Sequence, residues 1–349
     1  MSDSEIVQLV RPLVIEMAPY RSARDEFEDF DAQKIFLDAN ENPYNTNVNR
    51  YPDPLQRRLK RVLAKVKGVS ADQILLGNGS DEVLDLIFRT FCEPGQDEVI
   101  LLPPTYGMYG VLAQLNNVKA VDVPLDDNFQ LDIASIMSSV NENTKVIFVC
   151  SPNNPSGNAI PFEQIEILLK RFKGLVVVDE AYIDFSEQIS ALSLLETYPK
   201  LIICQTLSKA YGLAGIRLGI GFANPEIIDF FNKIKAPYNV NVLTQKTALV
   251  SLNAPTVVKR QVKTLIEERQ KMERELPAFG FVNKIYPSDA NFILIQVDDA
   301  QKRYDQFLEQ GIVVRNRSSL LGCENTLRIT IGTTEENITF INVCKSIDQ

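Results

Sequence analysis

The chain has 349 residues, of which 45% are hydrophobic and 23% charged, a composition that is typical of a folded globular protein and excludes a disordered one. Its net charge of −9 at pH 7 argues against nucleic acid as a partner, because polyanions are bound by an excess of basic side chains. The sequence contains no histidine, which excludes Ser-His-Asp triads, Cys-His dyads and histidine general bases. Proton transfer near neutral pH must therefore use Lys, Asp, Glu, Tyr or Cys.

The five cysteines are widely spaced and include no Cys-x-x-Cys pair, so we expect neither a metal site nor a disulfide framework, and a reducing compartment. No run approaches the ~18 uncharged apolar residues that a membrane span requires. The first residues, Met1-Ser2-Asp3-Ser4-Glu5, lack the basic and apolar regions of a signal peptide. We therefore expect a soluble, cytoplasmic protein without membrane contact, and its length suggests about two domains.

In chain order, apolar residues at helical spacing from Ile6 to Val14 predict an N-terminal helix, with a polar connector after Pro19. We expect residues 1–32 to form a helix and arm that join a smaller domain. The middle of the chain then alternates β-branched runs with helical patterns. Strands are predicted at Lys145–Cys150, Leu175–Asp179, Leu201–Thr206 and Leu218–Phe222, and a helix over Pro161–Phe172.

Continuous β-branched runs separated by helices predict an α/β fold, with a mainly parallel central sheet covered by helices on both faces. We assign residues 33–245 to this larger domain. After residue 245 the pattern changes to a long polar helix, about Pro255–Leu276, followed by short strands. These strands are expected near Asn291–Val297, Ile312–Arg315 and Leu327–Ile331, so residues 246–349 are predicted to form a smaller α+β domain.

Three predicted strands end in polar groups, and ligands bind at the carboxyl ends of strands in open α/β sheets. The ends carry Ser-Pro-Asn-Asn-Pro-Ser-Gly at 151–157, Asp-Glu-Ala-Tyr at 179–182 and Thr-Leu-Ser-Lys at 206–209. Taken singly, the two asparagines would be ordinary turn residues, Asp179 a helix cap or surface acid, and Lys209 a solvated charge. Their occurrence on successive strand ends favours a site.

A lysine with no histidine nearby suggests Schiff-base chemistry, and pyridoxal 5′-phosphate (PLP) pairs such a lysine with an acidic partner for its pyridine nitrogen. The PLP phosphate needs N–H donors at a helix start, hydroxyls and an arginine. The glycine-rich turn at residues 77–81 precedes a helical stretch, Glu82–Cys92, and supplies the first of these. It is neither a Walker loop nor a full Gly-x-Gly-x-x-Gly, since Glu82 stands where the third glycine would be.

These segments, together with Arg217, resemble the fold-type I PLP-dependent aminotransferases. A narrower resemblance, to the histidinol-phosphate aminotransferase family, rests on four further motifs that extend the match over residues 19–332. They are Pro19-Tyr-x-Ser-Ala-Arg24, Leu37-Asp-Ala-Asn-Glu-Asn-Pro43, Arg50-Tyr-Pro-Asp-Pro54 and Leu327-Arg-Ile-Thr-Ile-Gly332. The family converts L-histidinol phosphate and 2-oxoglutarate to imidazole-acetol phosphate and L-glutamate, by a ping-pong route in histidine biosynthesis.

The resemblance implies a role for each matched residue. Lys209 would form the aldimine and serve as acid and base in the 1,3-proton shift. Asp179 would keep the pyridine nitrogen protonated. The catalytic residues would be Lys209, Asp179 and Tyr182. Tyr182 and Asn154 would hydrogen-bond the phenolic oxygen of PLP, and Tyr106 would stack on its ring.

For the PLP phosphate, the resemblance implies main-chain N–H donors from Gly79 and Ser80, the hydroxyl of Ser208 and the guanidinium of Arg217. Tyr51 would reach the cofactor phosphate of a neighbouring subunit, which implies a homodimer. The expected cofactor contacts are completed by Asp81 and Thr206.

For small-molecule substrates, Arg328 and Arg315 would bind the acidic end, with Tyr20 and Asn40 lining the pocket. Because Arg317 lies two residues after Arg315, the identity of the second arginine stays open. The alternatives are an aromatic or broad-range aminotransferase and a phosphothreonine decarboxylase, which would share the same lysine, aspartate and phosphate site. A non-catalytic PLP-binding regulator is disfavoured because residues 1–32 leave no room for a DNA-binding domain.

Overall fold

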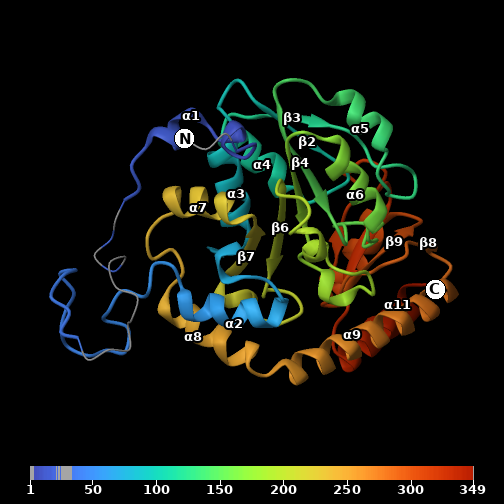
Figure 1. The fold of residues 1–349 in the computed structure, drawn as a ribbon. Helices are drawn as coiled ribbons and strands as arrows, with labels where there is room; N and C mark the ends of the chain where they lie inside the picture. Colours follow the sequence, from blue (N-terminus) through green and yellow to red (C-terminus); the bar gives the residue numbers. More distant parts are fainter. Residues whose placement is uncertain (1–3, 21, 23, 25–33, 349) are drawn as a thin grey trace.

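A seven-stranded sheet forms the centre of the protein in a computed structural model, which describes residues 4–20, 22, 24 and 34–348 (Figure 1). The strand order across the sheet is β1-β7-β6-β5-β4-β2-β3. In chain order the strands are β1 (Ile74–Asn78), β2 (Glu98–Leu101), β3 (Lys119–Asp122), β4 (Thr144–Cys150), β5 (Leu175–Asp179), β6 (Leu201–Thr206) and β7 (Leu218–Ala223).

The strands β3, β2, β4, β5 and β6 run parallel to one another, whereas β7 is antiparallel to both β6 and β1. Every residue of β5 is buried, as expected for a strand that is covered on both faces. The predicted mainly parallel α/β fold is therefore confirmed. The carboxyl ends of β4, β5 and β6 meet at one edge of the sheet, where their polar ends come together.

Helices cover both faces of this sheet and enclose two apolar cores (Figure 1). Alternate residues of each strand point to opposite faces, so Val176 and Val178 enter one core and Val177 enters the other. The first core lies under α2 (Arg57–Lys67), α5 (Ile133–Ser139), α6 (Phe162–Arg171) and α8 (Val242–Leu252). The second lies under α3 (Ser80–Phe91), α4 (Met108–Leu115) and α7 (Pro225–Ile234).

The N-terminal segment differs from its prediction in form. Instead of one helix, the chain forms a 3-10 turn, Val7–Leu9, and a short helix, α1 (Pro12–Glu16). Arg11 is extended because the residue before a proline is disfavoured in the helical region. Ile6, Val10 and Val14 pack into the second core of the large sheet, and most of the expected arm lies outside the described residues.

A second sheet of four antiparallel strands, in the order β10-β11-β9-β8, follows in the chain. Its strands are β8 (Val282–Ile285), β9 (Phe292–Val297), β10 (Arg315–Asn316) and β11 (Thr326–Thr330). It packs with α9 (Pro255–Glu275), α10 (Ala300–Glu309) and α11 (Thr334–Ile347) around a third core. The strand predicted at Ile312–Arg315 is only the two-residue β10, which places Arg315 opposite Arg328.

Short 3-10 turns complete the described chain, at Ala71–Gln73, Ile183–Phe185, Ala191–Leu194, Ala214–Ile216 and Leu276–Ala278. Among the residues that the structure describes, none of the helices is both long enough and apolar enough to cross a membrane.

Candidate active site

A pocket of about 140 Å³ opens at the carboxyl ends of β4, β5 and β6. Of the residues expected to contact the cofactor, all except Gly79 and Tyr51 line it. The lining residues are Ser80, Asp81, Tyr106, Cys150, Asn154, Asp179, Ala181, Tyr182, Thr206, Ser208, Lys209, Ala214 and Arg217. The residues singled out on separate strand ends in the sequence therefore share one cavity.

Asp179 lies at the base of the pocket, where β5 ends, and is 3% exposed. Its Oδ2 accepts a hydrogen bond of 2.8 Å from the hydroxyl of Tyr109, and its Oδ1 accepts one of 3.1 Å from the main-chain N–H of Ala181. Burial raises the pKa of Asp179 to about 6, against the effect of these hydrogen bonds. The carboxylate is thus prepared for a cationic partner in the pocket.

Tyr109 is a site residue that the sequence analysis missed. It is fully buried and stacks on Phe148, with ring centroids 5.1 Å apart. In α4 it lies three and four residues before the buried Leu112 and Ala113, which is also the ordinary spacing of core residues on a helix. The hydroxyl distinguishes it, because a buried phenol needs a hydrogen-bond partner.

Lys209 follows β6 and extends into the pocket, with its Nζ 5.5 Å from the centroid of the Tyr182 ring. Although the residue as a whole is exposed, the pocket walls partly enclose its ammonium group. This desolvation lowers the pKa of Lys209, and the positive charge of Arg328 lowers it further. A lowered pKa increases the fraction of neutral amine, which is the form that reacts with a carbonyl.

A cup of donors lies at the first turn of α3. Gly79 precedes the helix with a φ of +85°, and a Cβ at this position would lie 2.6 Å from Nη2 of Arg217. A Cβ on Gly219 would lie 2.2 Å from the main-chain nitrogen of Ser80, so both glycines allow close approach of the backbone. Arg217 also pairs with Asp81, at 3.5 Å.

The hydroxyls of Thr206 and Ser208 continue this cup. The Oγ1 of Thr206 accepts a hydrogen bond of 3.1 Å from the main-chain N–H of Ser208 and lies 2.9 Å from its Oγ. Thr206 therefore shapes the turn that presents Ser208 and the following Lys209 to the pocket. N–H groups at a helix start, hydroxyls and an arginine form a suitable environment for a phosphate.

Asn154 connects the pocket with the second sheet. Its Nδ2 donates to the hydroxyl of Tyr182 at 3.4 Å, and its Oδ1 accepts from Nη1 of Arg328 at 2.5 Å. The guanidinium of Arg328 also lies 5.1 Å from the centroid of the Phe292 ring. The strand β11 thus carries a cation that contacts Asn154 in the wall of the pocket.

Two further arginines lie near Arg328. Arg315 is opposite it in the β10–β11 pair and is exposed, whereas Arg317 is partly buried. The Nε of Arg317 has no hydrogen-bond partner among the described residues. Burial raises the pKa of Tyr182, and the charges of Arg328 and Arg317 both oppose this rise. By position, Arg317 is therefore as good a candidate for the second anion-binding arginine as Arg315.

Besides Gly79, Arg315 and Arg328, three predicted site residues do not line the pocket in the single chain. Tyr20 is 75% exposed, and Asn40 lies on the exposed loop before α2 with a φ of +54°. Tyr51 is 50% exposed and stacks on Tyr238, with ring centroids 4.5 Å apart. All three belong to the N-terminal arm and the loop before α2, which lie outside the wall of this pocket.

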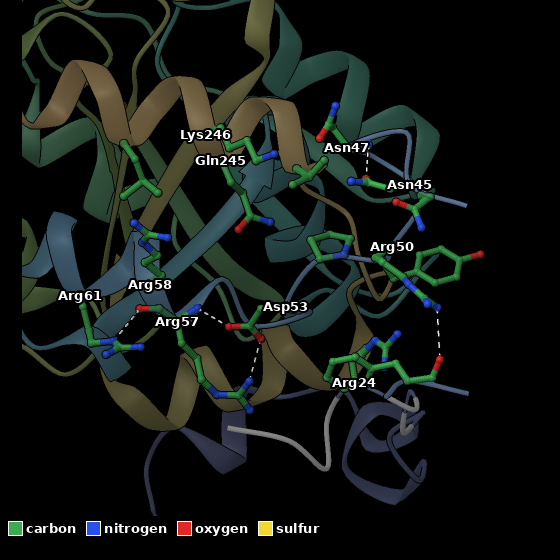
Figure 2. A pocket seen from close by; sticks show the side chains of 16 residues that line it. Arg24, Asn45, Asn47, Arg50, Asp53, Arg57, Arg58, Arg61, Gln245 and Lys246 are labelled. Carbon is green, nitrogen blue, oxygen red and sulfur yellow. Dashed lines mark hydrogen bonds and ion pairs between the residues drawn. The ribbon is translucent and has the colours of Figure 1, made fainter. Parts of the chain in front are cut away.

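Tyr51 lines a second cavity, of about 720 Å³, on the side of α2 and α8 (Figure 2). Its lining is rich in cations, including Arg50, Arg57, Arg58, Arg61 and Lys246. The only carboxylate among the lining residues belongs to Asp53, which pairs with Arg57 at 2.7 Å. This cavity contains no lysine with a nearby carboxylate at a strand end, so the pocket of Lys209 is the candidate active site.

The donor set of that pocket fits PLP. The buried Asp179 suits the pyridine nitrogen, Asn154 and Tyr182 suit the phenolic oxygen, and Lys209 suits the carbonyl carbon. The Ser208 hydroxyl, the Arg217 guanidinium and the main-chain N–H groups at the start of α3 suit the phosphate. Among the described residues, no group of three or more His, Cys, Asp or Glu side chains is placed to hold a metal ion.

Residues 26–345 match the family model described as aminotransferase class I and II. A histidinol-phosphate aminotransferase from Christiangramia forsetii is 56% identical over 348 residues, covering 100% of this chain and 99% of the relative. The histidinol-phosphate aminotransferase structure from Clostridium acetobutylicum has a TM-score of 0.80 at 27% identity, covering 86% of this chain and 91% of that one. The Sinorhizobium meliloti structure, in complex with PLP, has a TM-score of 0.80 at 25% identity, covering 86% and 84%. The chain therefore belongs to the class I and II aminotransferase family, as its sequence motifs predicted.

Proposed function

We propose that this protein is a PLP-dependent aminotransferase of histidine biosynthesis, which converts L-histidinol phosphate and 2-oxoglutarate to imidazole-acetol phosphate and L-glutamate. The observation that carries the proposal is the pocket in which Lys209, Asp179 and the Arg328–Asn154 contact occur together. The 56% identity to a histidinol-phosphate aminotransferase over the whole chain supports the substrate. When bound, PLP supplies a ring that accepts electrons from the substrate carbon.

Asp179 holds a proton at the pyridine nitrogen in this proposal. Its raised pKa reflects the cost of burying a carboxylate without a cation, and a protonated ring nitrogen removes that cost. Tyr109 and Ala181 fix the orientation of the two carboxylate oxygens. The pair is a charge-assisted hydrogen bond that keeps the ring able to accept electrons.

Lys209 would accept the proton from the substrate carbon and return it in the proton shift. A neutral amine is needed both to form the bond with the carbonyl carbon and to accept the proton, and the lowered pKa of Lys209 favours that form. Tyr182 and Asn154 would hold the phenolic oxygen of PLP, and Tyr106 would lie against its ring. Both half-reactions use this one site, so the kinetics are ping-pong.

The phosphate of PLP binds in the cup at the start of α3. The main-chain N–H groups of Gly79 and Ser80 would donate to this phosphate, together with Ser208 and Arg217. Asp81 orients Arg217 through their ion pair, and Thr206 orients Ser208. The substrate phosphate takes a separate place beside Arg328, with Arg315 or Arg317 as the second cation.

We further propose that the enzyme is a cytoplasmic homodimer in which Tyr51 reaches the cofactor phosphate of the partner. The loop before α2 supports this, since Ile35, Leu37 and Tyr44 are 89%, 87% and 79% exposed in the single chain. Exposed apolar side chains gathered in one segment are typical of a contact surface. Tyr20 and Asn40 belong to the same region and would line the substrate side of the completed site.

An aromatic or broad-range aminotransferase, or a phosphothreonine decarboxylase, would use the same lysine, aspartate and phosphate cup. These alternatives differ from the proposal in their substrates and products. The test is an assay of the purified holoenzyme with histidinol phosphate, phenylalanine, tyrosine and phosphothreonine, measuring glutamate and carbon dioxide. We expect glutamate to form fastest from histidinol phosphate, without carbon dioxide. Faster turnover of an aromatic amino acid, or release of carbon dioxide from phosphothreonine, would overturn the substrate assignment.

A further inference from the structure

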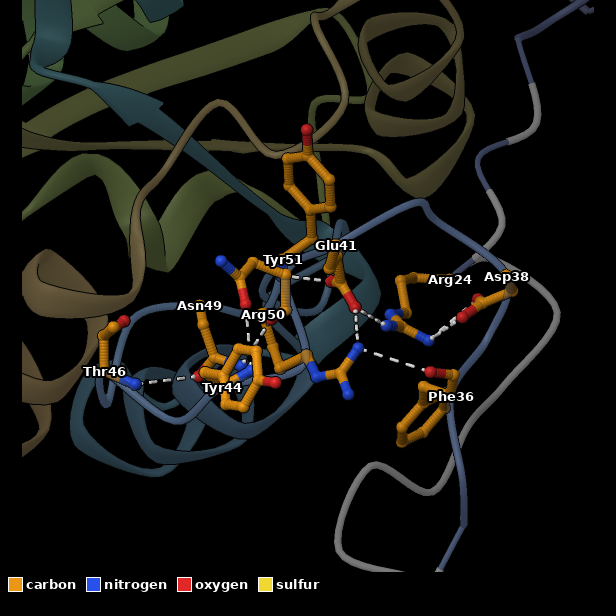
Figure 3. A network of polar contacts seen from close by, with 10 residues as sticks. Arg24, Phe36, Asp38, Glu41, Tyr44, Thr46, Asn49, Arg50 and Tyr51 are labelled. Atoms are coloured by element: carbon orange, nitrogen blue, oxygen red, sulfur yellow. Dashed lines mark hydrogen bonds and ion pairs between the residues drawn. The ribbon is translucent and has the colours of Figure 1, made fainter.

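Glu41 is the centre of a polar network that joins three separate segments of the N-terminal region (Figure 3). Its side chain is 3% exposed, and its Oε2 accepts from Nη2 of Arg24 at 2.6 Å and from Nη1 of Arg50 at 2.7 Å. Its Oε1 accepts from the main-chain N–H of Tyr51 at 2.6 Å. One carboxylate therefore connects residue 24 with residues 50 and 51.

Arg24 anchors this network. It is 1% exposed, and its Nη1 donates to both carboxylate oxygens of Asp38, at 2.7 and 2.8 Å. Its guanidinium lies 4.0 Å from the centroid of the Phe36 ring. A buried guanidinium needs anionic partners, and the removal of one leaves an uncompensated charge. Burial raises the pKa of Glu41, but hydrogen bonds from Arg50, Tyr51 and Arg24 outweigh this and keep it lowered.

The network, rather than an apolar core, holds the loop in this conformation. Among the described residues, no helix or strand lies between Glu16 and Arg57. Ile35 and Leu37 point to solvent, so they contribute little packing within the single chain. Arg50 adds a hydrogen bond of 3.3 Å to the main-chain oxygen of Phe36, which ties the two ends of the loop together.

Arg24, Glu41 and Arg50 belong to three of the sequence motifs but are not among the residues that line the pocket of Lys209. Arg24 ends the motif at residues 19–24, Glu41 lies within the motif at 37–43, and Arg50 precedes Tyr51 in the motif at 50–54. We propose that Glu41, held by Arg24 and Arg50, is a positioning residue that fixes Tyr51 for the active site of the second subunit. This inference rests on the proposed dimer, in which Tyr51 acts on the partner's cofactor phosphate.

Two anchors define the place of Tyr51. The carboxylate of Glu41 holds its main-chain N–H, and its ring stacks on Tyr238 at an interplanar angle of 18°. Loss of the first anchor leaves the ring contact but frees the backbone. The consequence should appear in the partner's site and not in the pocket of the same chain.

Mixed dimers of two differently tagged chains test this directly, with Lys209→Ala on one chain so that a single site can bind PLP covalently. In one arrangement Glu41→Gln is placed on the chain that lacks Lys209, and in the other on the chain that retains it. Two quantities are measured. One is kcat/KM, and the other is the rate at which the dimer loses the cofactor that borohydride can attach to it. We expect kcat/KM to fall and the rate of cofactor loss to rise, each by about tenfold or more, only in the first arrangement. The reason is that Glu41→Gln removes hydrogen bonds to a charged group.

Tyr51→Phe in the same two arrangements separates this inference from the proposed dimer. If Tyr51→Phe acts across the dimer and Glu41→Gln acts within its own chain or has no effect, the positioning role is wrong and the proposed function stands. If Tyr51→Phe does not act across the dimer, the premise itself fails and the inference fails with it. The inference is supported if Glu41→Gln and Tyr51→Phe both lower kcat/KM only when they are on the chain that lacks Lys209.

A matched control and a milder variant complete the design. Asp298→Asn breaks a similar ion pair in the small domain, where Asp298 Oδ2 lies 2.7 Å from Nη2 of Arg303, and should give equal values in both arrangements. If Glu41→Gln does not fold, Arg50→Gln replaces it, because Arg50 is 38% exposed and gives one of the three hydrogen bonds to Glu41. Equal effects of Arg50→Gln in both arrangements would overturn the proposal.

Discussion

The hydroxyl of Tyr109 donates a 2.8 Å hydrogen bond to Oδ2 of Asp179, and both residues are buried beneath the pocket. The other oxygen of Asp179 accepts from the N–H of Ala181. Burial raises the pKa of Asp179 to about 6, whereas each of these donors favours the ionised carboxylate. Tyr109 therefore helps to keep Asp179 anionic and correctly turned toward the pyridine nitrogen that we propose it binds.

Tyr109→Phe keeps the aromatic ring and removes this donor. We expect the pKa of Asp179 to rise further, and kcat to fall by roughly tenfold, as hydrogen bonds to charged groups contribute about 1.5–3 kcal/mol. A pH titration of the bound cofactor's absorbance should show a shifted transition. Tyr198→Phe is the matched control, because Tyr198 donates to Glu166 at the same 2.8 Å away from the site. An unchanged titration in Tyr109→Phe would contradict this role.

Borohydride reduction of the holoenzyme should attach the cofactor to Lys209, and the purified protein should be yellow. Lys60 is the informative competitor, since burial lowers its pKa to about 8. It lies on α2, however, and is not among the residues that line the pocket of Asp179. Peptide mapping after reduction checks the site of attachment. A label on Lys60, Lys233 or Lys235 would show that the assignment is wrong.

Asp179→Ala should leave a folded protein that holds PLP loosely and turns over at least roughly 10²-fold more slowly, comparable to the loss of a preorganised electrostatic partner. Glu180→Gln is the neighbouring control. Glu180 is also buried, but its carboxylate is bonded to Ser190, Ala191 and Gln205, away from the pocket. We expect that variant to alter stability without weakening PLP binding. Near wild-type turnover in Asp179→Ala would rule out the proposed role of Asp179.

The strand ends of the central sheet could be predicted because β4, β5 and β6 are rich in β-branched residues and each ends in a polar group. A parallel sheet brings such ends to one edge, so Asp179 and Lys209 were expected to meet. Tyr109 could not be found in this way, because its spacing in α4 is also that of a core residue. The strand β3 escaped prediction because it contains one β-branched residue between polar ends.

The N-terminal region was harder to predict for two physical reasons. Pro12 interrupts the helical pattern, since Arg11 before it is extended, and one expected helix becomes a 3-10 turn and a short α-helix. Ile6 and Val10 are apolar, so the sequence predicts that they are buried, but it does not predict in which core they pack. Tyr51 depends on a second subunit in our proposal, so neither its spacing nor the single chain gives its final environment.

The substrate phosphate offers the sharpest test of the function. Arg328 is enclosed at the edge of the pocket, where burial lowers its pKa and Asn154 accepts its hydrogen bond. Arginine binds a phosphate through two parallel donors, which a neutral group cannot satisfy. A site built in this way rejects an analogue that leaves its polar groups unpaired.

We therefore expect kcat/KM for histidinol phosphate to exceed that for histidinol by on the order of 10³-fold or more. Arg328→Ala should narrow this gap by slowing the phosphorylated substrate far more than histidinol, since only the former loses its charged partner. Arg260→Ala, an exposed arginine on α9, is the surface control and should leave the ratio unchanged. Steady-state assays of both substrates with the three proteins measure the ratio directly. If histidinol matches histidinol phosphate in the unmutated enzyme, the substrate assignment fails, whereas membership of the aminotransferase family is unaffected.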